Sequence, residues 1–88
     1  MQKFRTVRTI VDEDKVVSAE INEDLQSGRH SFILLRSYEG ADGVVKQSRY
    51  FRVEHGAAIR RVLILAERAL EELEAERFAQ TRRPRSPV

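Results

Sequence analysis

The spacing of hydrophobic residues changes character close to residue 57. From there to about residue 78, apolar residues recur at the i, i+3, i+4, i+7 spacing of one helix face, namely Ile59, Val62, Leu63, Ala66, Ala69, Leu70 and Leu73. This period predicts a single amphipathic helix over Ala57–Phe78. Ile64 lies off the stripe, and an apolar residue on that outer side agrees with a second subunit packing there.

Before the helix, four segments have the alternation and the Val, Ile, Thr and aromatic content of β-strands, namely Phe4–Val11, Lys15–Glu23, His30–Tyr38 and Val44–Val53. The third segment is apolar on both faces in its middle, which is typical of a central strand or of a face that meets another subunit. The order of elements predicts an α+β fold. We expect a curved four-stranded antiparallel sheet followed by one long C-terminal helix, in one domain over residues 1–78.

The last ten residues, 79–88, differ in composition, with three arginines, both prolines and no apolar period. They are predicted to form a disordered basic tail. A chain of 88 residues buries only roughly 60–65% of its unfolded surface, so such domains are marginal alone and many complete their core with a second copy. These features favour a homodimer formed through helix 57–78 and the sheet.

The formal net charge of +2 arises in the tail, but residues 29–53 have a local excess of positive charge. This stretch contains five Lys and Arg residues and only two acids, Glu39 and Asp42, both in a turn. Surfaces that bind single-stranded nucleic acid combine positive charge along the backbone path with flat side chains on which bases stack. The candidate phosphate contacts are Arg29, Arg36, Lys46, Arg49 and Arg52, and the candidate stacking residues are Tyr38 and Tyr50.

These side chains are expected on the sheet face that the helix leaves uncovered. Alternation along the fourth strand puts Lys46, Tyr50 and Arg52 on one face, and a shift of one residue would exchange them for Arg49 and Phe51. The alternative interpretation is an ordinary solvated strand face, because polar strand faces are commonly charged and Tyr and Phe are good strand formers. The basic tail is likewise either a phosphate-binding extension or a solubilising end.

Other classes of site find little support. The chain has no cysteine, which excludes disulfides, thiolate metal sites and a Cys nucleophile. His30 and His55 lack ligand spacing, and the acidic cluster at residues 12–14 lacks the glycine of a calcium loop, so it is interpreted as a solvated turn. No base–nucleophile constellation is evident, and we predict neither an enzyme nor a cofactor.

A membrane location is not expected either. The longest strictly apolar stretch, Val62–Ala66, is much too short to span a bilayer. The first ten residues, MQKFRTVRTI, lack the apolar core of a signal peptide. The sequence therefore predicts a cytoplasmic protein.

Gly28-Arg29 precedes an apolar strand, and a turn with Gly40 and Gly43 leads to a further strand and the helix. This order of elements, over roughly Lys15–Leu73, resembles the PUR domain, named for binding purine-rich elements, and in particular its short bacterial single-repeat members. The resemblance implies two such units intertwined through their helices, with single-stranded DNA or RNA bound on the sheets. Whirly proteins share this general design. The family's Lys-x-Asn before the first turn is replaced here by Glu23-Asp24-Leu25.

Two hypotheses follow. The first is a single-stranded DNA- or RNA-binding homodimer with little sequence preference. The second is a non-catalytic protein-interaction or structural dimer of the same fold that binds no nucleic acid. The missing Lys-x-Asn and the balanced charge of residues 1–78 favour the second, whereas the basic and aromatic hairpin favours the first.

Overall fold

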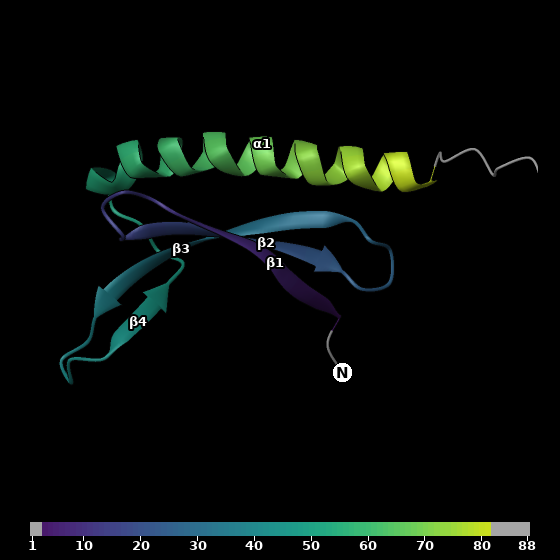
Figure 1. Ribbon diagram of the computed structural model, residues 1–88. Helices are drawn as coiled ribbons and strands as arrows, with labels where there is room; N and C mark the ends of the chain where they lie inside the picture. Colours follow the sequence, from purple (N-terminus) through teal and green to yellow (C-terminus); the bar gives the residue numbers. More distant parts are fainter. Residues whose placement is uncertain (1–2, 82–88) are drawn as a thin grey trace, which may run out of the picture.

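The computed structural model describes residues 3–81, which form four antiparallel strands followed by one helix (Figure 1). The α+β prediction is confirmed, with the strands in the spatial order β1-β2-β3-β4. The elements are β1 Phe4–Val11, β2 Val17–Asp24, β3 His30–Glu39, β4 Val45–Ser48, a short 3-10 helix η1 Val53–His55 and the helix α1 Gly56–Thr81.

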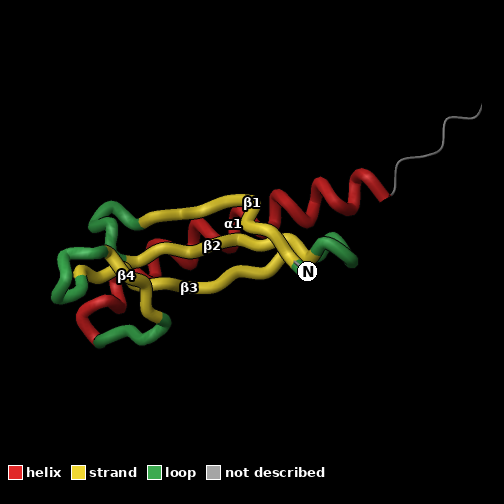
Figure 2. Tube along the Cα trace, turned by 90° about the horizontal axis from the view of Figure 1, so that it is seen from below, coloured by secondary structure: helices red, strands yellow, loops and turns green. Residues whose placement is uncertain are grey.

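The helix α1 runs along one face of the sheet, and the opposite face is bare of other elements (Figures 1 and 2). Alternate residues of β2 point toward the helix, and three of them, Val17, Ala19 and Ile21, are fully buried. On the helix, the buried positions are Ala58, Val62, Ala66 and Ala69. The last three lie on the predicted stripe, and Ala58 was not part of it. Most of these side chains are small, which lets the helix approach the sheet closely. Ile64 is 54% exposed, as its position off the stripe predicts.

Three element boundaries differ from those expected by more than one residue. β2 begins at Val17, because Lys15 adopts a left-handed backbone conformation (φ 62°) within the preceding turn. β4 ends at Ser48, five residues before the predicted end. The helix continues through residues 79–81, which were expected to belong to the tail. The rest of the predicted tail, residues 82–88, lies outside the described residues.

The β3–β4 hairpin extends away from the helix (Figure 1). β4 pairs only with the last four residues of β3, from Arg36 opposite Ser48 to Glu39 opposite Val45. We call residues 36–48 the hairpin arm. Because this arm bends away from α1, its side chains stay accessible even on the helix side of the sheet.

An ion pair at the N-terminal half of the helix ties α1 to the β1–β2 turn. Arg61 donates from Nε to Asp12 Oδ1 at 2.9 Å and from Nη2 to Asp12 Oδ2 at 2.8 Å. The Asp12 side chain is only 3% exposed, so the expectation of a solvated acidic turn is wrong at this position. The hydrogen bonds from Arg61 hold the pKa of Asp12 at about 2, below its ordinary 3.8, although burial acts in the opposite direction.

This pair predicts a loss of stability in acid. Because the pKa of Asp12 is lower in the folded state, its contribution is complete above about pH 4 and is lost as the pH falls toward 2. Asp12→Asn should lower the urea midpoint at pH 6, and the difference from wild type should shrink between pH 4 and 2. Glu13→Gln, which leaves both Arg61–Asp12 hydrogen bonds in place, is the matched control. Equal midpoints for Asp12→Asn and wild type at pH 6 would contradict the prediction.

Candidate nucleic-acid interface

The sheet face that the helix leaves bare carries no Lys or Arg from β1–β4. Residues directly opposite each other in an antiparallel pair lie on the same face of the sheet. Because Val17, Ala19 and Ile21 are buried on the helix face, the pairing register assigns every paired strand residue either to the helix face or to the bare face. The bare face presents mainly Ser, Thr, Asn and apolar residues, and its charged residues are Glu20, Asp24 and Glu39. The expectation that this face carries the Arg, Lys and Tyr side chains is therefore wrong.

The basic and aromatic residues of β3 and β4 lie instead on the helix side of the hairpin arm. Arg36 is opposite both Val17 and Ser48, and Tyr38 is opposite Lys46. The Arg36 guanidinium lies over the Tyr38 ring, with Cζ 5.3 Å from the ring centroid. Such a cation–π contact fixes both groups without neutralising the charge of the arginine. The structure thus brings Arg36, Tyr38 and Lys46 together.

Arg49, Tyr50 and Arg52 do not lie on a strand. After β4 the Ser48 hydroxyl accepts a hydrogen bond from the Tyr50 N–H at 3.0 Å, and the chain turns toward the helix. Arg36 Nε donates to the Tyr50 carbonyl at 2.7 Å, which attaches this segment to the arm. The Tyr50 side chain is 83% exposed. Residues 49–52 therefore continue the surface of the arm.

The cations of this surface have no close carboxylate partner. In the described part of the chain, Arg36, Arg49 and Arg52 take part in no ion pair, and Lys46 approaches only Asp42, at 3.9 Å. Three arginines that link β1 to β2 or the helix to the β1 region, Arg5, Arg8 and Arg61, have carboxylate partners, and Arg77 pairs with Glu74 on the same helix. The arm and residues 49–52 therefore present four cations without a close ion pair. Other cations that form no ion pair within residues 3–81, namely Lys3, Lys15, Arg29, Arg60 and Arg68, lie elsewhere on the fold.

Arg29 is separated from the other candidates. It directly precedes β3, whereas Arg36 lies seven residues further along the same strand, about 23 Å away at the usual rise. The turn before Arg29 contains Gly28, whose φ of 76° is a left-handed backbone conformation that other residues rarely adopt. A single strand bound at the arm would have to continue along β3 to reach Arg29.

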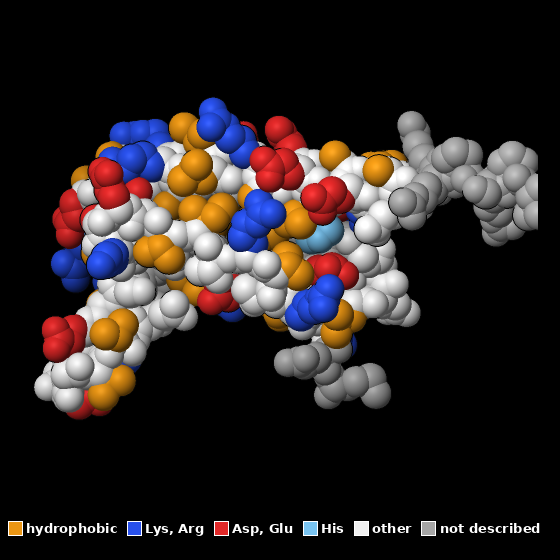
Figure 3. All heavy atoms as spheres, viewed as in Figure 1, with side chains coloured by type: hydrophobic (Ala, Val, Ile, Leu, Met, Phe, Trp, Pro, Cys, Tyr) orange, Lys and Arg blue, Asp and Glu red, His pale blue; other side chains and the backbone are white. Residues whose placement is uncertain are grey.

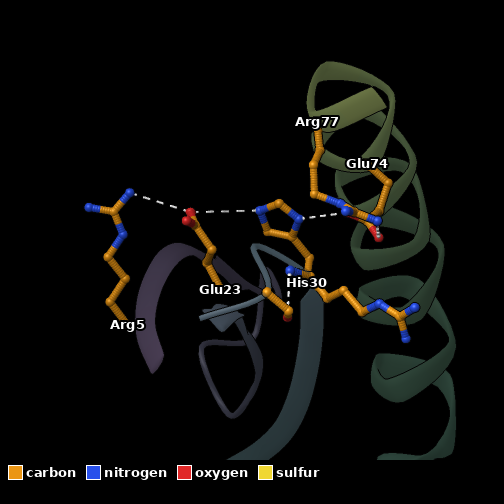
Figure 4. Close-up of polar contacts among 7 residues, drawn as sticks. Arg5, Glu23, His30, Glu74 and Arg77 are labelled. Atoms are coloured by element: carbon orange, nitrogen blue, oxygen red, sulfur yellow. Dashed lines mark hydrogen bonds and ion pairs between the residues drawn. The ribbon is translucent and has the colours of Figure 1, made fainter. Parts of the chain in front are cut away.

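A second polar cluster joins the far end of the helix to the sheet (Figure 4). His30 Nδ1 lies 2.9 Å from Glu74 Oε2, and His30 Nε2 lies 3.9 Å from Glu23 Oε2. Arg77 Nε also donates to Glu74, at 2.9 Å. The hydrogen bonds from His30 and then from Arg77 lower the pKa of Glu74. With its side chain 7% exposed, His30 is a structural residue and is not free to stack on a base.

This cluster borders a cleft of about 290 Å³ lined by Arg5, Glu23, His30, Glu76 and Arg77 among others. In its wall Arg5 pairs with Glu23, and Arg77 pairs with Glu74. Within residues 3–81, no group of His, Asp and Glu is arranged to hold a metal ion. No helix in the same range combines the length and apolar character needed to cross a membrane.

Sequence reasoning missed both helix-anchoring clusters. The partners Asp12 and Arg61 are 49 residues apart, and His30 and Glu74 are 44 apart, so no local pattern joins them. A signal was nevertheless present, because Arg61 and Glu74 flank the apolar stripe where a helix meets a sheet.

No family model, curated protein or solved structure matches this chain. The resemblance to the PUR domain accordingly stays a prediction based on the order and spacing of elements.

Proposed function

We propose that this chain is a single-stranded DNA- or RNA-binding protein of low sequence specificity that acts as a homodimer. The observation that carries the proposal is the surface formed by the hairpin arm and residues 49–52. It combines Arg36, Tyr38 and Lys46 with the open ring of Tyr50. We further propose that the protein acts in the cytoplasm, without a cofactor and without catalysis.

The chemistry of the surface fits a flexible polyanion. Unpaired guanidinium groups bind phosphate oxygens, and exposed aromatic rings stack on any base, which gives affinity without sequence preference. A duplex would hide its base faces from Tyr38 and Tyr50, so a single strand is the better ligand. The bare sheet face lacks Lys and Arg, and we assign it no phosphate contacts.

Self-association is supported by the apolar surface of a single copy. Val44, Val45 and Leu65 are 55%, 69% and 46% exposed. The buried hydrophobic residues are few and mostly Ala and Val. A domain of this size with so small a core gains stability by burying apolar surface against a second copy.

The direct test is fluorescence anisotropy with labelled single-stranded DNA, single-stranded RNA and duplex DNA at two salt concentrations. We expect binding to single strands that is stronger than binding to duplex and that weakens with salt, because phosphate contacts release counterions. Failure to bind any oligonucleotide at low salt would refute the proposal.

Tyr50 is the sharpest single-residue test of stacking. Tyr50→Ala should weaken single-strand binding by about 5- to 150-fold, the range of one base-stacking contact. Tyr50→Phe keeps the ring and should bind like wild type. Phe4→Ala, which removes a 57% exposed ring from β1, is the control for a nonspecific loss of aromatic surface. Unchanged binding by Tyr50→Ala would exclude Tyr50 from the interface.

The absence of Lys and Arg from the bare sheet face favours a second candidate function, a protein-interaction or structural dimer. The affinity of an interface of that kind would be largely insensitive to salt. For phosphate binding, the logarithm of the affinity falls linearly with the logarithm of the salt concentration. The anisotropy series at two salt concentrations separates the two functions.

A further inference from the structure

β3 has a neighbour along one edge but only part of a neighbour along the other. β2 pairs with residues His30–Arg36, whereas β4 pairs only with residues Arg36–Glu39. Within residues 3–81, no strand lies beside the outer edge of β3 from His30 to Leu35. An unpaired strand edge is a template for another strand, and natural edges are commonly protected by charged residues or proline. Residues 30–35, HSFILL, contain no Lys, Arg, Asp, Glu or Pro.

The hydrogen-bond register defines which groups face this edge. The Ser37 N–H donates to the Val16 carbonyl at 2.7 Å, and the Asp24 N–H donates to the Arg29 carbonyl at 2.8 Å. Odd-numbered residues of β3 therefore direct their backbone groups toward β2. By alternation, His30, Phe32 and Leu34 direct their N–H and C=O groups toward the unpaired edge.

The apolar layer between helix and sheet is incomplete along the same edge. The side chains of Phe32 and Leu34 share the helix face with Ile21 and Ala19, their partners on β2. They are only half-buried, and so are the helix residues Ile59, Leu63 and Leu70. Figure 3 faces the β1 side of the molecule, where hydrophobic side chains also lie along the opposite seam between the helix and the sheet. A strand added at the β3 edge would complete both the hydrogen bonding and the apolar layer.

We propose that the added strand is β3 of a second copy, paired antiparallel across a two-fold axis at Phe32. Only even-numbered residues offer outward backbone groups. Pairing all three of them requires Phe32 to lie opposite Phe32 of the partner subunit, and His30 opposite Leu34 of the partner subunit. The three pairs form about six hydrogen bonds. The product is one continuous sheet with both helices on the same side. This pairing deepens the self-association in the proposed function and does not require nucleic acid.

The chemistry of the edge favours a second copy over an unrelated peptide. The seam accepts a strand with apolar side chains at alternate positions on the helix face, and β3 itself supplies Phe32 and Leu34 at that spacing. An antiparallel strand edge is also self-complementary under two-fold symmetry. The two β2 strands would lie about 14 Å apart, three strand spacings. Packed helices lie about 8–10 Å apart, so the half-buried flanks at Ile59, Leu63 and Leu70 can meet over the junction.

The absence of cysteine from the chain makes disulfide crosslinking a clean test of the register. Ser31 and Ile33 lie on the bare face, away from the helix. In the proposed pairing Ser31 lies opposite Ile33 of the partner subunit, and Ile33 lies opposite Ser31 of the partner subunit. The Cα atoms of each pair are about 4.5 Å apart, which is within disulfide range. We expect the double variant Ser31→Cys/Ile33→Cys to form a covalent dimer on mild oxidation without nucleic acid. Each single variant places its two thiols out of register and should stay uncrosslinked.

Sedimentation measurements on wild type and on Phe32→Lys complete the test. Phe32→Lys brings two like charges together on the axis, so we expect the variant to be monomeric while far-UV circular dichroism stays unchanged. If this variant fails to fold, the crosslinking result decides alone. A monomeric wild type, or a dimer in which the double cysteine variant stays uncrosslinked, would overturn the pairing.

Anisotropy on the same samples keeps this inference distinct from nucleic-acid binding. A crosslinked dimer that binds no oligonucleotide would retain the β3 pairing and refute nucleic-acid binding. A monomer that binds single strands would refute the β3 pairing and support nucleic-acid binding.

Discussion

Ile21→Ala should lower the free energy of unfolding by about 2–5 kcal/mol. The Ile21 side chain is fully buried on the helix face of the central strand β2, and its truncation leaves a cavity that the close-packed helix cannot fill. A chain of this length is expected to have a total stability of about 4–13 kcal/mol. The single substitution therefore removes a large share of it.

Ile64→Ala is the matched control, because it makes the same chemical change on the same fold. Ile64 is 54% exposed on the outer side of α1, so the unfolding free energy should change by less than about 0.5 kcal/mol. Urea unfolding at one fixed protomer concentration is the appropriate measurement, since dimerisation adds a concentration-dependent term. Equal losses for the two variants would mean that α1 presents a different face to the sheet or that Ile64 is buried in the dimer.

The contrast between Ile21 and Ile64 illustrates which features a sequence pattern can predict. Alternation in β2 and the helical stripe in α1 are direct consequences of burying one face of each element. These two periods are sufficient to place Val17, Ala19 and Ile21 on one buried face and Ile64 on the exposed side of the helix, as the structure confirms. The element order then follows from turn composition.

The position of the candidate site could not be predicted in the same way. Alternation says that Lys46 and Arg49 lie on opposite faces, but it does not say which face the helix covers. That depends on the pairing of Arg36 with both Val17 and Ser48, a non-local property of the hairpin. The early end of β4 depends on two contacts of Tyr50, its N–H with the Ser48 hydroxyl and its carbonyl with Arg36, which no periodic pattern encodes.

The distribution of ion pairs links the fold to the proposed function. Arginines that attach the helix or β1 to the sheet have carboxylate partners, whereas the arm and residues 49–52 retain positive charge. Net charge conceals this separation, because the whole chain carries only +2. Long-range attraction is therefore weak, and local contacts must supply the affinity.

Replacing Arg36, Lys46, Arg49 and Arg52 together by Gln should reduce single-strand affinity on the order of a thousandfold at 50 mM salt. Each phosphate contact contributes about −0.7 to the slope of log affinity against log salt for single strands, so four contacts steepen that slope by about 3. The variant should show a correspondingly flatter salt dependence. Fluorescence anisotropy over a series of salt concentrations measures both quantities, and thermal unfolding monitors the loss of the Arg36–Tyr50 hydrogen bond.

A second variant with the same change in net charge provides the control. Lys3, Lys15, Arg60 and Arg68 are exposed, and in the described part of the chain they form no ion pairs. All four lie outside the arm and residues 49–52, so their replacement by Gln should lower single-strand affinity only by a few-fold, through weaker long-range electrostatic attraction. The slope of log affinity against log salt should stay nearly unchanged. If both variants lost affinity equally, binding would depend on net charge and not on the arm. If neither lost affinity, these cations would not contact the nucleic acid.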